Sequence, residues 1–324
     1  MNPPQLRILE IAPGLTQIKL PLPFELREVN VHLLRQPDGY ILFDTGYHTT
    51  DDCFATLEAS LQSLGVAWTD IHTVALTHMH PDHMGNAHRI LQLTQGARLA
   101  MQSDEAMHLQ AIADAGRPPW FEALLDRAAT PADLRLEVFD AFRDIREQTR
   151  ALTPDIPLTD GQTFAGFEVI HTPGHSPGHI CFYDRAAKLF LSGDHMLPGI
   201  TPNIGWMPGE DMLGHYLQSL RKVHPLVVKT VVPSHGKPFE GHQAWLQATA
   251  GHHEERCLQI CMIAADRPFT AHEIVGELWK RKLAPFHYQF AVSEILAHLE
   301  YMLARGQIQS VPEDPQRIAW RAAR

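Results

Sequence analysis

A run of potential metal ligands stands out in the sequence, Thr77-His78-Met79-His80-Pro81-Asp82-His83. It places three imidazoles and one carboxylate directly after a short apolar segment, and these two ligand types together suit zinc, iron or manganese. In an extended turn, His78 and His80 would point toward one metal while Asp82 and His83 would reach a second. Two ions roughly 3.5 to 4 Å apart could share a hydroxide. The run therefore predicts hydrolytic chemistry at a pair of metals.

Further ligands must come from other loops, because one local run cannot complete two coordination shells. Three candidates each follow a predicted strand and stand next to Gly or Pro residues, which allow the backbone to turn. They are His175 in Thr172-Pro173-Gly174-His175-Ser176-Pro177-Gly178-His179, Asp194 after Leu189 to Gly193, and His235 after Val231 to Ser234. The sequence thus draws one site from four separated loops.

The elements that must position these loops are short strands alternating with amphipathic helices. Strand signals are Leu15 to Leu20, Val29 to Leu34, Tyr40 to Asp44, Thr163 to His171, Ile180 to Tyr183, Leu189 to Ser192 and Thr230 to Pro233. Helical periodicity covers Asp52 to Leu64, a segment after the histidine run to about Gln95, and Met212 to Val223. Strands followed by helices, repeated, predict a layered α/β core.

Two further segments depart from this pattern. Residues from about 104 to 155 read as a helical insertion whose Trp120 and Phe121 we expect to form a lid beside the site. The chain from 246 to 324 holds a T-x-x-E capping box at Thr270, a second helix over Gln289 to Ala304 and a strand after Gly306. This order resembles a small winged-helix module. We therefore expect a catalytic domain over 1–245 and a separate module over 246–324.

Composition argues against a nucleic-acid-binding protein and against a membrane-spanning protein. The chain has 324 residues, with 27 Lys and Arg against 37 Asp and Glu, a formal charge of -10 that would repel a phosphate backbone. The second helix of the C-terminal module also lacks Lys and Arg, so nucleic acid is an unfavourable partner and packing or homodimerisation is the better interpretation. No stretch approaches the roughly 18 apolar residues of a membrane span. Four dispersed cysteines indicate reduced thiols and a cytoplasmic location.

Most of the 21 histidines have no spacing that argues for a ligand. His179, four residues after His175, is interpreted as a hydrogen-bonded structural residue. The others left out of the site are His72, His88, His108, His195, His215 and His242. Cys257 and Cys261 stand one helical turn apart near His252 and His253, where a structural zinc is conceivable, but buried free cysteine is much commoner.

The ordered motifs resemble those of a known family. Asp44-Thr45-Gly46, H-M-H-P-D-H, TPGHSPGH, the SGD that ends at Asp194 and the SHG that contains His235 are similar in order and spacing to the five signature motifs of the metallo-β-lactamase superfamily, over about residues 10 to 245. The resemblance implies a four-layer αββα sandwich with the site at one edge. It also implies two divalent metal ions, zinc first, with iron or manganese as alternatives.

The resemblance assigns a role to each ligand. The first metal would take His78, His80 and His175, the second would take Asp82, His83 and His235, Asp194 would bridge them, and Asp44 would brace the histidine run through hydrogen bonds. His80 stands where the flavodiiron branch has Glu, which argues against oxygen reduction with a flavin.

The activity expected from the resemblance is hydrolysis of a thioester or ester of a small molecule. TPGHSPGH resembles hydroxyacylglutathione hydrolases, although the C-terminal region does not resemble their glutathione-binding end. A metal-bridging hydroxide would attack the carbonyl, with Asp82 orienting it and Asp194 as the second catalytic carboxylate. An RNA phosphodiesterase, a lactonase and a non-catalytic ligand-binding regulator on the same scaffold stay open.

The segments flanking the site predict what reaches it. The loop from Met196 to Pro208 contributes apolar side chains, and so does the insertion. The residues expected to line a lidded apolar pocket are Ile200, Ile204, Trp206, Met207, Trp120 and Phe121. Such a pocket predicts hydrolysis that strengthens with acyl length, and a Trp206→Ala variant whose KM rises more than its kcat falls.

Overall fold

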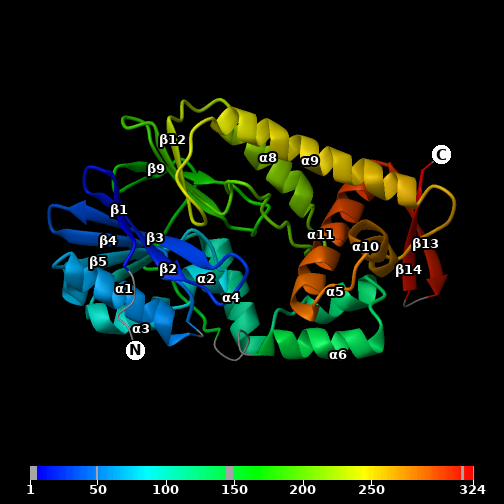
Figure 1. Cartoon of the computed structure of the whole chain (residues 1–324), viewed down its shortest axis with the longest axis horizontal. Coiled ribbons are helices and arrows are strands. Elements are labelled where there is room, and N and C mark those ends of the chain that lie inside the picture. The colour runs from blue at the N-terminus through cyan, green and yellow to red at the C-terminus, as the bar shows by residue number, and fades with distance from the viewer. Residues whose placement is uncertain (1–5, 49, 144–148, 315–316, 324) are drawn as a thin grey trace.

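The computed structural model describes the chain except residues 1–5, 49, 144–148, 315–316 and 324. Twelve of its described strands form two sheets that face each other (Figure 1). The first sheet has the order β1 (Ile8–Ala12), β2 (Leu15–Pro21), β3 (Glu28–Gln36), β4 (Gly39–Phe43), β5 (Ile71–Ala75), β6 (Arg98–Met101) and β7 (Ile156–Pro157). The second has the order β12 (Thr230–Pro233), β11 (Leu189–Gly193), β10 (Ile180–Asp184), β9 (Phe167–His171) and β8 (Thr163–Phe164).

Both sheets change from antiparallel to parallel pairing toward the site. In the first sheet, β1 to β4 pair antiparallel and β4 to β7 pair parallel. In the second, β11 and β12 are the parallel pair. Because parallel strands end at the same sheet edge, the loops that follow β5, β11 and β12 can meet at one place.

Three apolar clusters define the layers. Phe43 of the first sheet packs edge-on against Phe182 of the second, with ring centroids 4.9 Å apart, inside the cluster between the sheets. The helices α1 (Asp51–Ser63) and α3 (Ala87–Thr94) cover the outer face of the first sheet, and α8 (Met212–Val223) covers that of the second. The predicted four-layer αββα arrangement is confirmed.

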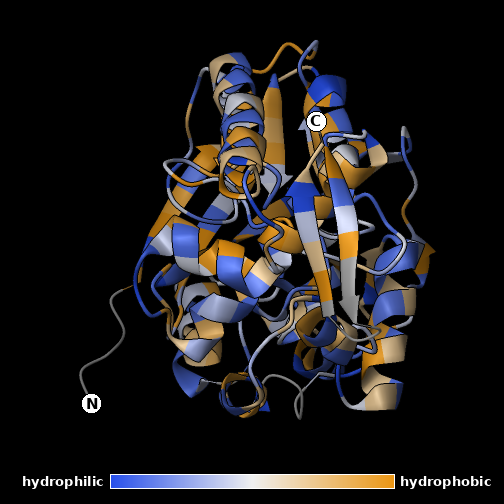
Figure 2. Cartoon of the chain, turned by 90° about the vertical axis from the view of Figure 1, so that its right-hand side faces the viewer, coloured by the Kyte–Doolittle hydropathy of each residue, from blue (hydrophilic) through white to orange (hydrophobic). Residues whose placement is uncertain are grey.

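The rest of the chain is mostly helical. The insertion holds α4 (Ser103–Ala115), α5 (Phe121–Arg127) and α6 (Ala132–Ala141), as predicted, although its residues 144–148 lie outside the described part of the chain. The C-terminal region holds α9 (His242–Ile263), α10 (Ala271–Trp279), α11 (Pro285–Ala304) and the hairpin of β13 (Ile308–Asp314) and β14 (Arg317–Ala322). Figure 2 views this end of the molecule, with the hairpin in front.

The C-terminal region shares an apolar core with the αββα sandwich. A single apolar cluster joins Phe190 and Tyr216 of the second-sheet layers to Val292, Leu296 and Trp320 of the C-terminal region, all fully or almost fully buried. The long helix α9 runs along the top of Figure 1 from the sandwich to the hairpin, and the predicted domain boundary after residue 245 falls inside it. Homodimerisation stays a prediction.

Element boundaries follow local sequence signals closely where those signals are strong. The bounds of α8 and β12 agree with the predicted ones, whereas β1 and most of α9 were not predicted. The single helix predicted after the histidine run is two helices, α2 (Pro81–Met84) and α3. No helix in the described residues is both long and apolar enough to cross a membrane, and the cytoplasmic location stays a prediction.

Candidate metal centre

The structure brings all seven predicted ligand side chains together. Each comes from a loop at a strand end: the histidine run follows β5, and the other three residues follow β9, β11 and β12. Three overlapping groups place their ligand atoms within 4.8 Å of one another. They are His78, His80 and His175; His78, His83 and Asp194; and Asp82, His83 and His235. The first and third groups match the two sets that the resemblance implies, and Asp194 lies between them.

Hydrogen bonds orient three of the imidazoles toward the centre of this cluster. His83 Nδ1 donates to Asp44 Oδ2 at 3.0 Å, His175 Nδ1 to the Asn203 carbonyl at 2.8 Å, and His235 Nδ1 to the Glu28 carbonyl at 2.8 Å. Each ring therefore carries a proton on Nδ1, and its neutral form presents the Nε2 lone pair to the centre. These three Nε2 atoms and Asp194 Oδ1 are buried with no hydrogen-bond partner. Buried polar atoms without partners are uncommon, and divalent cations at the two sites would satisfy all four.

The charges in the cluster are strongly coupled. Burial lowers the pKa of His80 to about 3 and that of His78 well below its ordinary value, so both rings are neutral, as metal ligation requires. Burial also acts to lower the pKa of His235, but the Asp194 and Asp82 carboxylates outweigh it and raise that pKa to about 10. The pKa of His83 shifts upward for the same reason. Two carboxylates and two imidazolium rings thus balance one another in the metal-free cluster.

A buried carboxylate braces the histidine run. Asp44 Oδ1 accepts from the Thr77 backbone N at 2.8 Å, and Asp44 Oδ2 accepts from Thr77 Oγ1 at 2.9 Å and from His83. To reach them, Asp44 adopts a left-handed backbone with φ 58°, which costs a residue with a Cβ roughly 1 kcal/mol or more. The hydrogen bonds offset that cost. This is the bracing role that the resemblance implies for Asp44.

Glycines allow two ligand loops to approach their neighbours. Gly193, directly before Asp194, has φ 51°, and a Cβ there would lie 2.6 Å from His179 Nε2. Gly174, directly before His175, has φ 133°, and a Cβ there would lie 2.4 Å from the Cα of Tyr216 in α8. A side chain at either position would push its ligand out of place.

The loop that carries His235 is held by the first sheet. Asn30 in β3 donates from Nδ2 to the Pro233 carbonyl at 2.9 Å and to the Gly236 carbonyl at 3.1 Å, on both sides of the ligand. Lys19 in β2 also donates to the Gly236 carbonyl and pairs with Glu28. The second sheet therefore supplies the ligand, and the first sheet fixes its position.

One buried group at the centre was not predicted from the sequence. Glu105 in α4 is fully buried, and its carboxylate accepts hydrogen bonds from Met79, Ser176 and Gly178, which belong to two ligand loops. Its local sequence resembles the start of any helix, with Ser103, Asp104 and Glu105 in the first turn. Nothing in that local pattern indicates that Glu105 belongs to a functional site.

His179 and the two neighbouring cysteines of α9 behave as structural residues. His179 Nε2 accepts from the Asp194 backbone N at 3.1 Å and its Nδ1 contacts Thr172 Oγ1 at 2.8 Å, so both ring nitrogens are used, as predicted. Cys257 and Cys261 are free, and no group of possible ligands in the described residues includes them. The alternative of a structural zinc there is not supported.

The apolar surroundings differ from those predicted. Ile204, Trp206, Met207 and Phe121 belong to the large buried cluster that joins the catalytic and C-terminal halves, because the loop after β11 packs under α11. Trp206 itself is only 5% exposed. These four side chains, which we expected to line a lidded apolar pocket, are therefore packed in the core, and Ile200 of the same loop is exposed.

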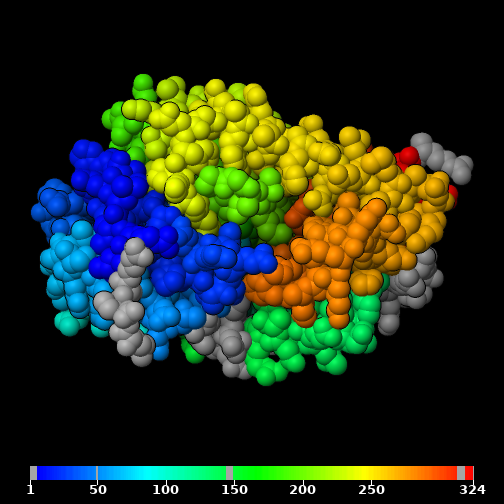
Figure 3. Space-filling view, in the orientation of Figure 1, coloured from blue at the N-terminus to red at the C-terminus, as the bar shows by residue number. Residues whose placement is uncertain are grey.

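A different set of aromatic residues packs together where separate segments of the chain meet. The rings of Phe24 and Phe286 stack with centroids 5.4 Å apart, and those of Phe286 and Phe142 stack at 4.9 Å. Tyr47, which follows the Asp44 motif, packs edge-on against Phe24 at 4.9 Å. We call these four residues the aromatic row. It joins the β2–β3 connection, the end of α6 and the start of α11, and Figure 3 shows the surface hollowed where the N-terminal, central and C-terminal segments meet.

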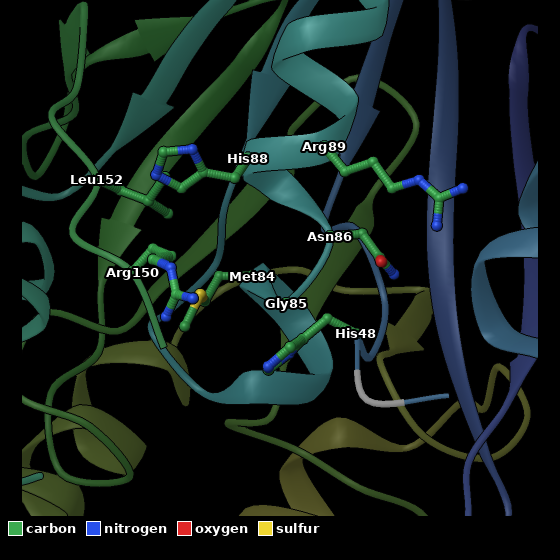
Figure 4. Close-up of a pocket in the computed structure, with 8 residues that line it drawn as sticks. All are labelled: His48, Met84, Gly85, Asn86, His88, Arg89, Arg150 and Leu152. Carbon is green, nitrogen blue, oxygen red and sulfur yellow. The ribbon is translucent and has the colours of Figure 1, made fainter. Parts of the chain in front are cut away.

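A cavity of about 240 Å³ borders the short helix α2, which also carries the ligands Asp82 and His83 (Figure 4). Among the described residues, eight line it: His48, Met84, Gly85, Asn86, His88, Arg89, Arg150 and Leu152. Four of these eight are Arg or His, and none of the eight is a carboxylate. The Arg89 guanidinium lies over the Phe54 ring at 3.4 Å. The cavity is therefore a locally basic place in an acidic protein.

Comparisons with known families agree with this geometry. Residues 25–235 match the model of the metallo-beta-lactamase superfamily, and residues 257–323 match that of a metallo-beta-lactamase-like C-terminal domain. In the solved structures, a metallo-beta-lactamase family protein of Thermus thermophilus has a TM-score of 0.84 at 28% identity, covering 97% of this chain and 100% of its own. A beta-lactamase domain protein of Burkholderia ambifaria has a TM-score of 0.83 at 27% identity, covering 98% and 94%.

Three curated proteins illustrate the sequence similarity. The Bacillus subtilis protein named Probable metallo-hydrolase YqjP is 26% identical over 309 residues, covering 90% of this chain and 93% of its own. The human acyl-coenzyme A thioesterase MBLAC2 is 28% identical over 171 residues, covering 50% and 55%. An atrochrysone carboxyl ACP thioesterase of Aspergillus fumigatus is 32% identical over 109 residues, covering 32% and 33%.

Proposed function

Because the chain belongs to the metallo-β-lactamase superfamily, we propose that it is a two-metal hydrolase that cleaves a thioester, or a related ester, of a small molecule with an apolar acyl group. The observation that carries the proposal is the interlocking ligand cluster, whose inward-facing Nε2 atoms have no partner of their own. A chain that had lost catalysis would not need to keep such a cluster complete.

Seven residues would hold the metals. His78, His80 and His175 would hold the first ion, Asp82, His83 and His235 the second, and Asp194 would contact both. When bound, two zinc ions would polarise the substrate carbonyl and lower the pKa of a water molecule toward neutrality, with iron or manganese as alternatives.

The protein's own groups would prepare the reaction around the ions. Asp82 lies 3.2 Å from His235 Nε2 and shares its pocket with Asp194, so these two carboxylates can accept and orient the proton of an attacking water. Asp44 and the backbone carbonyls of Asn203 and Glu28 keep three ligand rings in the tautomer that leaves Nε2 available.

Two features of the surroundings favour a thioester of a large carrier. Three rings of the aromatic row, those of Phe24, Phe142 and Phe286, are partly exposed, which suits an apolar acyl group because burying apolar area stabilises by about 25 cal/mol per Å². The basic cavity beside α2 suits an anionic group at the other end of the substrate. Similar proteins named for acyl-coenzyme A and ACP thioesterase activity support the same substrate class.

The deciding experiment is a substrate panel with metal-loaded protein. We expect hydrolysis of acyl-coenzyme A thioesters, with kcat/KM rising as the acyl chain lengthens from acetyl to decanoyl. A His80→Ala variant should lose turnover by several orders of magnitude. The panel also contains homoserine-type lactones and single-stranded RNA. Efficient cleavage of RNA, or of lactones alone, with no acyl hydrolysis would replace the proposal by the phosphodiesterase or lactonase alternative.

A non-catalytic regulator on the same scaffold is the remaining alternative. It would bind members of the panel without turning any of them over, even with two metals per chain. Metal content and turnover measured on one preparation therefore separate the two functions.

A further inference from the structure

We propose that Glu105 is a positioning residue for the first metal, in the way that Asp44 positions the histidine run. The assignment rests on the proposed two-metal site. It concerns the three ligands His78, His80 and His175, which come from two loops that are nearly a hundred residues apart in the sequence. Glu105 is the carboxylate that joins those loops.

The N-cap of α4 is made by Gln102, so the Glu105 side chain is not needed to cap the helix. Glu at the third position of a helix commonly folds back to accept from the N-cap backbone. In α4 the N-cap residue Gln102 instead accepts from the Asp104 and Glu105 backbone N–H groups with its own side chain. The Glu105 side chain is thereby free to point away from its helix and toward the metal centre. The positive end of the helix dipole also favours a carboxylate at this position.

The contacts of Glu105 divide between the two loops. One oxygen, Oε2, accepts from the Met79 backbone N at 2.6 Å, and Met79 stands between His78 and His80. The other, Oε1, accepts from Ser176 Oγ at 2.7 Å and from the Gly178 backbone N at 2.5 Å, one and three residues after His175. The carboxylate therefore fixes the distance between the loop with two ligands and the loop with the third.

The chemistry of the donors explains why a carboxylate is needed. Two of the three partners are backbone N–H groups, which can only donate, so both oxygens of the side chain must accept. A carboxylate meets this demand, because neither of its oxygens carries an obligatory proton. Complete burial raises the pKa of Glu105 to about 7, and its three hydrogen bonds act against that rise. An amide cannot meet it, because one of its two ends is itself a donor. Glu105→Gln therefore sets a donor against a donor at one loop or the other.

Asp44 serves the other half of the centre. Its hydrogen bonds go to Thr77 and to the His83 ring, a ligand of the second group. Two buried carboxylates thus brace the cluster from two directions. Loss of Glu105 should weaken the first metal site selectively, and this selectivity distinguishes positioning from general support of the fold.

The test measures each site separately by removing a ligand of the other. In a His235→Ala background, with the second group broken, Glu105→Gln should weaken zinc binding by about 10 to 100-fold, the range typical of residues that orient metal ligands. In a His80→Ala background, with the first group broken, the same change should leave zinc affinity within about threefold. Competition with a chromophoric chelator gives both affinities without any assay of turnover. Asp114→Asn, an exposed carboxylate on the same helix, is the matched control.

Equal weakening in both backgrounds, or none in the His235→Ala background, would overturn the assignment. Ser176→Ala is a milder variant in case Glu105→Gln fails to fold, because it removes one hydrogen-bond donor and leaves the carboxylate in place. It should cause a smaller loss of zinc affinity, and only in the His235→Ala background. The visible spectrum of cobalt(II) in that background should also change with Glu105→Gln. A parent chain that binds one ion would refute the two-metal function, while the titration in the His235→Ala background would still decide the role of Glu105.

Discussion

At the scale of single residues, the protons on His83 and His235 determine how the centre takes up metal. Both rings have a raised pKa in the metal-free cluster, that of His235 reaching about 10, because Asp194 and Asp82 outweigh the effect of burial. Both are therefore protonated at pH 7.5. A ligating imidazole must be neutral, so we predict that loading two zinc ions releases roughly two protons per chain at that pH. Calorimetric titration in two buffers of different ionisation enthalpy measures the number.

The sign of the pH effect follows from the same shifts. An unfolded histidine titrates near 6.5, so the stability that these ion pairs contribute to the metal-free protein is present below that pH and is lost as the pH rises toward 10. His235→Asn should remove one of the released protons. Zinc uptake with no proton release in either buffer would contradict the ionic arrangement of the cluster.

The position of Trp206 changes what its removal should do. Its side chain is buried in the apolar cluster, and its backbone N donates to Ser293 Oγ of α11 at 2.8 Å. We now expect Trp206→Ala to lower the free energy of unfolding by about 3 to 5 kcal/mol, as large-to-small changes in a core do. Urea denaturation measures the loss, and Ile200→Ala, at a 45% exposed position in the same loop, is the control. An unchanged denaturation midpoint with a raised KM would restore the pocket role first predicted for Trp206.

The sequence predicted the ligands and the bracing residue Asp44, and it missed Glu105 and Asn30 for one physical reason. Ligands such as His175 and Asp194 stand beside Gly and Pro at the ends of apolar strands, so chain-local patterns mark them. Glu105 and Asn30 act through contacts with loops far away in the chain, and their own neighbours look like any helix start or strand. Such contacts depend on how elements pack, which local spacing does not record.

At the scale of elements, three separate segments supply the stacked rings of the aromatic row, and we expect these rings together to determine the preference for acyl length. Phe142 follows α6, Phe286 begins α11 and Phe24 precedes β3, and their rings stack in sequence. We predict that Phe142→Ala raises KM for a decanoyl thioester about tenfold, which corresponds to about 1.4 kcal/mol, and leaves KM for the acetyl thioester nearly unchanged. Steady-state kinetics on both substrates provides the test.

Leu136→Ala is the matched control, because Leu136 lies on α6 with 69% of its surface exposed. Equal effects of Phe142→Ala on the short and long substrates would show that the row supports the fold without contacting the acyl group.

The C-terminal helices form part of the main core. Val292 and Leu296 of α11 and Trp320 of β14 share one apolar cluster with Tyr216 of α8. Removing residues 246–324 would expose this cluster and also cut α9 near its start. We predict that the truncated chain shows no cooperative thermal transition, whereas Met262→Ser, at a 71% exposed position on α9, unfolds like the parent. A truncated chain that melts cooperatively and retains its zinc would contradict this.

The contrast between α8 and α9 shows where element prediction succeeds. In α8 the buried positions are mostly Leu, Tyr, Met and Val at helical spacing, so the sequence alone reveals the helix. In α9 the buried residues are His242, Leu246, Thr249, His253, Cys257 and Ile260. Their spacing is equally helical, but four of the six are polar or weakly apolar, so a search for apolar periodicity does not detect this helix.

At the scale of the whole molecule, one cavity differs in charge from the rest of the protein. The chain carries a formal charge of -10, yet the cavity beside α2 is lined by two arginines and two histidines. An anionic group of the substrate would be attracted there and repelled elsewhere. We predict that Arg150→Gln raises KM for an acyl-coenzyme A, which carries phosphates, about five- to tenfold, and leaves KM for the phosphate-free N-acetylcysteamine thioester unchanged.

Arg185→Gln is the control, since Arg185 is an exposed arginine that pairs with Glu168 on the second sheet. If Arg150→Gln alters both substrates equally, the cavity supports the structure and does not recognise the anion.

Asn203 connects two parts of the molecule that are otherwise described separately. Its carbonyl accepts from the His175 ring at 2.8 Å, and its side-chain amide donates to the Phe290 carbonyl of α11 at 3.2 Å. A metal ligand and the first turns of a C-terminal helix are therefore mechanically linked through one residue. A change in the packing of that helix should therefore alter the affinity for zinc. The rate at which a chelator removes zinc would then report whether the C-terminal helices are correctly packed, without any substrate.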